Sequence, residues 1–120
     1  MDSLSKKVLI TGIGGFTGTY LAQHFSSSGY EVFGIGNAEN PSEKNYFCCD
    51  LREKKQLEEI ISEIQPNIVI HLAAISFVGH PNIEDFYSIN VVGTQNLLDA
   101  LKKHNKNIQK VILASSATVY

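Results

Sequence analysis

The chain has 120 residues, of which 43% are hydrophobic and 18% are charged, and its formal net charge is −2 at pH 7. This length allows one domain with a sizeable core, and the balanced charge gives no basic surface for a nucleic acid or an anionic membrane. No apolar run has the length of a membrane span. We therefore expect one domain, residues 1–120, that binds neither nucleic acid nor membrane.

The N-terminus and the cysteines indicate a cytoplasmic protein. Residues 1–5 contain no positively charged region and no apolar stretch, so no signal peptide is expected. Cys48 and Cys49 are adjacent, and neighbours in a strand point to opposite faces, which argues against a disulfide between them. Free cysteines are typical of a protein in a reducing compartment such as the cytoplasm.

The first predicted strand, Val8 to Ile10, leads directly into the glycine-rich stretch TGIGGFTG, residues 11–18. We expect Gly12 to permit the turn off the strand and Gly15 to leave no side chain between the backbone and a ligand. Gly18 would let the first helix pack against the strand.

A helix over about Gly15–Ser28 follows, with Gly29 as its left-handed cap. Amides near Gly15, Phe16 and Thr17 would be unpaired at the start of this helix, where the dipole favours an anion such as a pyrophosphate. The alternative is a glycine-rich turn that only joins a strand to a helix.

The second predicted strand, Tyr30–Ile35, ends at Gly36 and Asn37, where a dinucleotide-binding fold often presents an acid to the adenosine ribose. A carboxylate there would bond the 2′-hydroxyl of NAD and repel the 2′-phosphate of NADP. Gly36 leaves the choice between the two cofactors open. Asn37 can hydrogen-bond a ribose hydroxyl or a phosphate, and a plain turn is the alternative.

A surface loop, Ala38–Lys44, precedes a short third strand, Tyr46–Cys49. Asp50 then either caps the next helix or accepts a hydrogen bond from the adenine amine; the two roles are compatible. The helix is predicted over Glu53–Gln65 and ends at Pro66. Its apolar stripe consists of Leu57, Ile60, Ile61 and Ile64.

The fourth predicted strand, Asn67–His71, is continuously apolar, as buried parallel strands are. The small residues of Leu72-Ala73-Ala74 would let a flat ligand lie against the backbone beyond the strand. His71 is interpreted as a hydrogen-bonded structural residue, with catalysis as the less favoured alternative. Residues 75–82 are predicted to form a loop or lid.

A long helix is predicted over Ile83–His104, in which Gly93 permits close packing and Asn90 is a polar group without an evident partner. The fifth strand, Ile108–Ala114, ends in Ser115 and Ser116. Hydroxyls at the carboxyl end of a parallel strand face the ligand crevice, where one can bind or polarise a substrate carbonyl. This last strand would leave an uncovered edge that favours self-association.

These elements predict a three-layer α/β Rossmann-like fold, a doubly wound sheet of five parallel strands in the order 3-2-1-4-5. Five motifs, at residues 11–18, 50–51, 71–74, 90–94 and 115–120, make the chain resemble the N-terminal part of the extended short-chain dehydrogenase/reductases. The resemblance is to the NAD-dependent epimerase/dehydratase group, which acts on nucleotide sugars.

The resemblance implies a role for each motif. Gly12, Gly15, Phe16 and Thr17 would surround the pyrophosphate, residues 50–51 the adenine, and residues 72–74 the ribose and the nicotinamide side. Asn90 would support the cofactor pocket. Ser116 would hydrogen-bond the reacting oxygen of a nucleotide-sugar substrate, as an incomplete catalytic site. The expected contacts with NAD or NADP are Gly12, Gly15, Phe16, Thr17, Gly18, Asn37, Asp50, Leu51, Leu72, Ala73, Ala74, Asn90 and Ser115.

The chain departs from the family in one respect that concerns catalysis. Full members carry a Tyr-x-x-x-Lys pair that moves the proton, and none of the tyrosines of this sequence has a lysine four residues on. We therefore expect the NAD(P)-binding portion of a nucleotide-sugar epimerase or reductase, inactive by itself. The alternatives are a non-catalytic NAD(P)-binding or regulatory module and a Rossmann domain without a ligand.

Overall fold

A parallel β-sheet forms the centre of the computed structural model, which describes residues 6–13, 16–36, 45–72 and 91–113. Within these residues the sheet has five strands in the order β3-β2-β1-β4-β5, and every neighbouring pair is parallel. The predicted strand order is confirmed. The strands are β1 (Lys7–Thr11), β2 (Glu31–Gly36), β3 (Tyr46–Cys48), β4 (Ile68–His71) and β5 (Lys110–Leu113).

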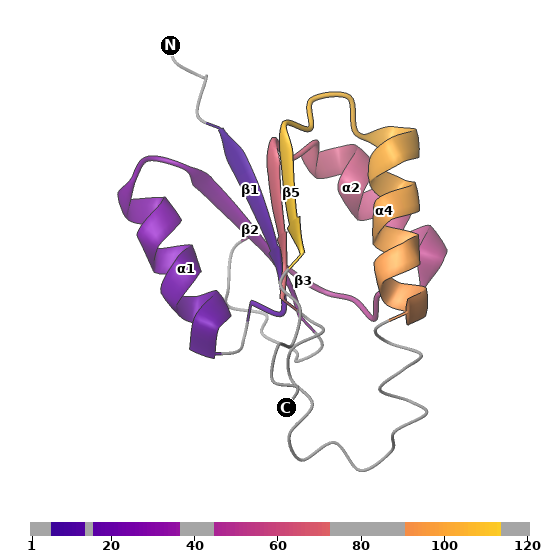
Figure 1. The fold of residues 1–120 in the computed structure, drawn as a ribbon, viewed down its shortest axis with the longest axis horizontal. Helices are drawn as coiled ribbons and strands as arrows, with labels where there is room; N and C mark the ends of the chain where they lie inside the picture. The colour runs from indigo at the N-terminus through magenta and orange to yellow at the C-terminus, as the bar shows by residue number, and fades with distance from the viewer. Residues whose placement is uncertain (1–5, 14–15, 37–44, 73–90, 114–120) are drawn as a thin grey trace.

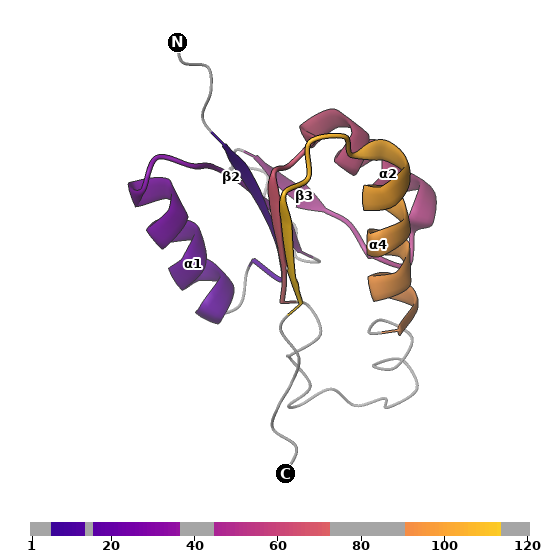
Figure 2. The same cartoon turned by 45° about the horizontal axis from the view of Figure 1, so that its top comes forward.

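Helices lie on both faces of the sheet. Helix α1 (Phe16–Ser27) covers one face, and α2 (Lys54–Ile64) and α4 (Gly93–His104) lie together on the other (Figure 1). The same three layers remain separate when the molecule is turned (Figure 2). This arrangement confirms the predicted three-layer α/β fold.

The element ends agree with the sequence-based prediction to within one residue, except at the last strand and at the start of α4. Strand β5 begins at Lys110, two residues later than predicted, because the amides of Gln109 and Lys110 both donate to the carbonyl of Asn67, at 2.7 and 3.2 Å. Ile108 packs against the core before the strand begins. The predicted start of the α4 helix, Ile83, lies outside the described residues.

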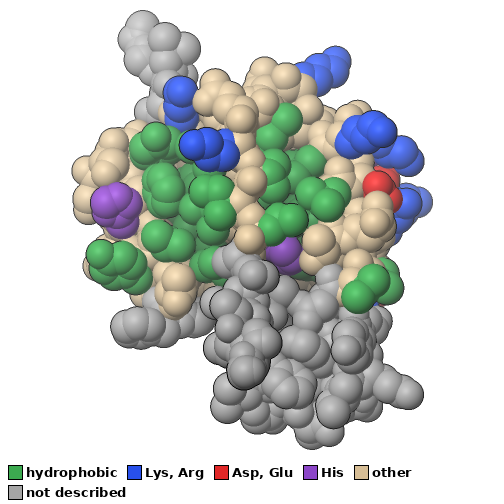
Figure 3. Space-filling model, viewed as in Figure 1, with side chains coloured by type: hydrophobic (Ala, Val, Ile, Leu, Met, Phe, Trp, Pro, Cys, Tyr) green, Lys and Arg blue, Asp and Glu red, His purple; other side chains and the backbone are tan. Residues whose placement is uncertain are grey.

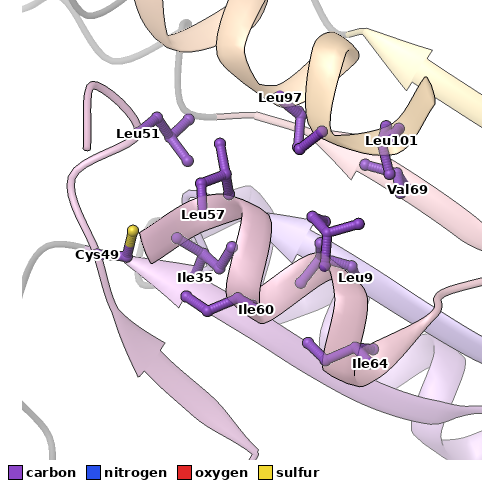
Figure 4. Close-up of a cluster of buried hydrophobic side chains, with 12 residues drawn as sticks. Leu9, Ile35, Cys49, Leu51, Leu57, Ile60, Ile64, Val69, Leu97 and Leu101 are labelled. Atoms are coloured by element: carbon purple, nitrogen blue, oxygen red, sulfur yellow. The ribbon is translucent and has the colours of Figure 1, made fainter. Parts of the chain in front are cut away.

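Each face of the sheet has its own hydrophobic core. The larger cluster lies beneath α2 and α4, and its members come from β1, β2, β4, both helices and the segment between β3 and α2 (Figure 4). The predicted apolar stripe of α2 is buried in it as a whole. The smaller cluster, beneath α1, is formed by Val8, Ile10, Ile70 and Leu72, and the Leu21 and Phe25 side chains of α1 pack against it.

Two residues in the left-handed conformation end helices α1 and α2. Gly29, with φ +92°, ends α1 as predicted, and the amide of Tyr30 returns to the carbonyl of Phe25 at 3.0 Å. Gln65, with φ +52°, caps α2. Its side chain accepts from the Lys106 amide at 2.9 Å, which joins the ends of α2 and α4.

Strand β5 lies at the edge of the described sheet and carries exposed apolar side chains. Ile112 and Leu113 are 44% and 48% exposed. Figure 3 shows hydrophobic side chains gathered on the face that presents β5, between α1 and the two helices of the other layer. The predicted self-association through this edge stays a prediction.

Candidate cofactor site

The candidate site lies where β1, β2, β3 and β4 end, since the carboxyl ends of parallel strands meet at one edge of the sheet. Thr11 and His71 stand opposite each other in the register of β1 and β4, and Thr11 stands opposite Ile35 in that of β1 and β2. The glycine turn leaves β1 at this edge. The sequence-predicted site residues in the described part all follow or adjoin these strand ends.

The glycine turn after β1 is held by its backbone. Gly12 has φ +75°, a conformation that side chains disfavour, and its amide donates to the carbonyl of Ile35 at 2.8 Å. The predicted role of Gly12 in the turn is thereby confirmed. The Ile13 side chain packs over Gly34, where a Cβ would lie only 2.7 Å from Ile13 Cγ2. The Gly12 amide and the Ile13 side chain thus both hold the turn against β2.

Gly18 brings α1 against the glycine turn. A Cβ at this position would lie 2.5 Å from the Gly12 carbonyl oxygen and 2.7 Å from Ile13 Cα, both backbone atoms. The sequence predicted that Gly18 lets the helix pack against the strand, whereas the nearest atoms to a Cβ at this position belong to the turn that follows the strand. A side chain at this position would therefore push the helix away from the turn.

The beginning of α1 provides donors for an anion. The helix starts at Phe16, and no acidic side chain lies in its first turn. The first amides of any helix lack an intrahelical acceptor, and the dipole places partial positive charge there. Thr17 is exposed at this end. A negatively charged group held here would meet no opposing carboxylate of α1.

Asp50 makes a local ion pair instead of a helix cap. Its Oδ1 accepts from the Arg52 amide at 2.9 Å, and its Oδ2 accepts from the Arg52 guanidinium at 2.8 Å. Helix α2 is capped by Glu53 without a side-chain hydrogen bond, so the predicted capping role of Asp50 is wrong. The hydrogen bond from the Arg52 side chain lowers the pKa of Asp50. The carboxylate is 43% exposed, so a ligand can still reach it.

Leu51 faces the protein core. Its side chain is 5% exposed and belongs to the cluster beneath α2 and α4. Gly93 lies against it, since a Cβ there would be 3.0 Å from Leu51 Cβ, and this confirms that Gly93 permits close packing. The Leu51 carbonyl accepts from Asn96 Nδ2 at 3.0 Å. The Leu51 backbone is therefore fixed by α4, and an adenine contact by this residue stays a prediction.

His71 joins three elements through hydroxyl groups. Its Nδ1 lies 2.6 Å from Thr11 Oγ1 on β1, and its Nε2 lies 2.8 Å from Thr94 Oγ1 on α4. The side chain is buried, and burial lowers its pKa. Each threonine hydroxyl can donate or accept, so a neutral ring satisfies both nitrogens. This geometry confirms the hydrogen-bonded interpretation of His71.

Leu72 continues this network at the end of β4. Its amide donates to both the carbonyl oxygen and Oγ1 of Thr11, each at 3.1 Å. Its side chain is buried in the smaller core cluster. Leu72 therefore presents backbone to the site, and its side chain serves packing.

Several predicted site residues lie outside the described part of the chain, so their roles stay predictions. The sequence-based prediction assigned no role to the buried Thr11 and Asn96 or to the partly buried Thr94. The burial of Asn96 could have been predicted from the sequence, because it lies three residues after Gly93 and four before Ala100, on the same buried face of α4. The undescribed site residues are Gly15, Asn37, Ala73, Ala74, Asn90, Ser115 and Ser116.

The described residues carry no metal-binding group of three or more histidine, cysteine or acidic side chains. Both cysteines are free, Cys48 exposed and Cys49 buried, which agrees with the prediction of no disulfide. Burial raises the pKa of the Cys49 thiol to about 11, with a further contribution from Asp50. No described helix is long and apolar enough to cross a membrane.

Comparison with known proteins shows similarity to one family along almost the whole chain. The model of the NAD dependent epimerase/dehydratase family matches residues 8–120. The UDP-glucose 4-epimerase of Pisum sativum is 32% identical over 100% of this chain and 39% of its own. The GDP-6-deoxy-D-talose 4-dehydrogenase of Aggregatibacter actinomycetemcomitans is 31% identical over 95% of this chain and 36% of its own.

Solved structures of this family share the fold. The UDP-glucose 4-epimerase from Brucella ovis in complex with NAD matches with a TM-score of 0.80 and 31% identity, over 97% of this chain and 37% of that chain. The chain thus spans about two fifths of the length of the proteins that it resembles.

Proposed function

Because this chain belongs to the NAD-dependent epimerase/dehydratase family, we propose that it forms the cofactor-binding portion of a nucleotide-sugar epimerase or reductase. The reaction would be hydride transfer at a sugar carbon. Two relatives support this substrate class, since they carry the names UDP-glucose 4-epimerase and GDP-6-deoxy-D-talose 4-dehydrogenase. Bound NAD would supply the hydride acceptor.

The glycine turn is the single observation that carries the proposal. Gly12 adopts φ +75°, and Gly18 brings the first turn of α1 against the turn backbone. Free amides at the start of a helix, with no acidic side chain in its first turn, suit a pyrophosphate. The residues present therefore fit the phosphate groups of a dinucleotide.

The other roles follow from position at the same edge of the sheet. Asp50 has an accessible carboxylate for the adenine amine, and its pairing with Arg52 keeps that carboxylate ionised. The Thr11, His71 and Thr94 network holds the ends of β1 and β4 against α4, and so positions the backbone that would line the nicotinamide side.

Chemistry at the sugar is assigned only in part. Ser116 would hydrogen-bond the reacting oxygen of the sugar, as the sequence predicts. General acid or base catalysis is assigned to no residue of this chain, because no tyrosine has a lysine four residues on. Cytoplasmic location and self-association stay predictions as well.

Calorimetric titration of the chain with NADH tests the proposal. We expect NADH to bind, and we expect Gly15→Val to abolish binding by placing a side chain where the pyrophosphate approaches the backbone. The matched control is Gly29→Ala at the opposite end of α1, where a Cβ meets no atom within 4 Å. A folded chain that binds no NADH, or a Gly15→Val variant that binds it normally, would contradict the proposal.

A further inference from the structure

The ring of Tyr46, the first residue of β3, lies over the end of β2. A dinucleotide-binding fold often has an acidic side chain at this position. Gly36 is the last residue of β2, at the same sheet edge as the glycine turn. A Cβ on Gly36 would lie 2.7 Å from the hydroxyl oxygen of Tyr46 and 3.1 Å from its Cε1. The Tyr46 side chain thus occupies the volume into which a side chain at position 36 would extend.

The Tyr46 hydroxyl lies on the same face of the sheet as the glycine turn. Ile13, in the turn, packs over Gly34 on the α1 face. Gly36 is two residues further along β2 and presents the same face, because the side-chain period of a strand is two. Tyr46 starts β3 opposite Gly34 in the register. The turn and the tyrosine therefore lie over Gly34 and Gly36, which are adjacent positions on one face of β2.

This placement matches the covalent structure of a dinucleotide. The adenosine ribose is attached directly to the pyrophosphate, so a pyrophosphate on the glycine turn brings the ribose next to the end of β2. An acid at that point distinguishes the cofactors, since it bonds a 2′-hydroxyl and repels a 2′-phosphate. A phenol hydroxyl carries no charge near neutral pH and can both donate and accept.

We propose that the Tyr46 hydroxyl contacts the adenosine ribose in place of that acid, an inference that rests on the proposed function. It hydrogen-bonds the 2′-hydroxyl of NAD and donates to the 2′-phosphate of NADP. The chain therefore accepts both cofactors, and Tyr46 together with Gly36 determines this tolerance.

Titration of the chain with NADH and NADPH in parallel tests the inference. Tyr46→Phe keeps the ring and removes the hydroxyl, and we expect it to weaken binding of both cofactors by about five-fold, the size of one hydrogen bond. The control is Tyr20→Phe on α1, whose side chain is 65% exposed, and it should change neither affinity. Chemical unfolding of each variant reports whether the fold is intact.

The double variant Gly36→Asp with Tyr46→Ala supplies the acid and removes the ring from its volume. We expect it to bind NADH and to weaken NADPH by at least about ten-fold relative to NADH, through like-charge repulsion. A Tyr46→Phe variant with unchanged affinities, or wild-type protein that binds NADH but no NADPH, would overturn the inference and leave the proposed function standing. Wild-type protein that binds neither cofactor would overturn both.

Discussion

Among the described residues, the sheet face beneath α2 and α4 buries twelve hydrophobic residues, whereas the face beneath α1 buries four. The second face completes its packing with partly buried side chains and with close contacts at Gly18 and Gly34. Apolar burial stabilises a fold in proportion to its area. The packing of α2 and α4 on the sheet thus contributes most of the stability. On the other face, α1 packs closely against the backbone of the glycine turn, where the cofactor is proposed to bind.

Matched leucine truncations on the two faces give the largest expected effect. Leu57 on α2 is 0% exposed, so Leu57→Ala should lower the free energy of unfolding by about 2–5 kcal/mol through lost burial and a cavity. Leu21 on α1 is only partly buried, and Leu21→Ala should cost about 1–2 kcal/mol. Urea denaturation measures both losses. Equal losses would show that the two faces contribute alike.

Gly18→Ala tests the close contacts of the α1 face. The new Cβ meets the Gly12 carbonyl and the Ile13 backbone, so we expect a loss of about 1–3 kcal/mol from overpacking together with weaker NADH binding. Gly29→Ala is the control, because its φ of +92° makes alanine strained in open space and should cost about 1–2 kcal/mol. The control should leave NADH affinity unchanged; if Gly18→Ala did so too, the turn would not be a phosphate site.

His71 links the ends of β1 and β4 to α4, and its contribution to stability depends on pH. Burial lowers its folded-state pKa below the ordinary 6.5, so the unfolded chain binds the proton more readily. Stability from the neutral ring is complete above pH 6.5 and is lost as the pH falls from there toward the folded-state pKa. The slope for one such group is at most about 1.4 kcal/mol per pH unit.

His71→Gln isolates this dependence. Glutamine is uncharged at every pH, so the variant should lose the decline in stability between pH 7 and pH 5 that the wild type shows in urea denaturation. At pH 7 it should itself cost about 1–3 kcal/mol, because the Thr11 and Thr94 hydroxyls lose their shared partner. The exposed His24, replaced by Gln, is the control. An unchanged decline in His71→Gln would assign the pH dependence to another group.

The sequence predicted the strand order and the apolar stripes because both follow from local patterns. Continuous apolar runs become buried parallel strands, and the spacing of Leu57 to Ile64 places those residues on one helix face. The conformation of Gly12 and Gly29 was predictable for the same reason, since positive φ favours glycine.

Contacts between distant residues could not be predicted in this way. The bond between Thr11 and His71 depends on the register of β1 against β4, and the bond to Thr94 depends on how α4 lies over the sheet. Asp50 was assigned to the helix cap because its type suits a cap, but the neighbouring Arg52 competes for both of its oxygens. Tyr46 gave no signal, because nothing in the sequence indicates that its ring lies beside Gly36.

Asp50→Asn has the smallest expected effect on stability and separates stability from binding. The pair with Arg52 is local and exposed to solvent, so its loss should cost less than about 1 kcal/mol. The lowered pKa of Asp50 means that this contribution is present above pH 3.8 and is lost as the pH falls through the folded-state value. If the carboxylate accepts from the adenine amine, NADH affinity should fall by about five-fold, while the exposed Glu59→Gln on α2 changes nothing. A stability loss above about 2 kcal/mol would place Asp50 among the residues that hold the fold, and unchanged NADH affinity would remove it from the cofactor site.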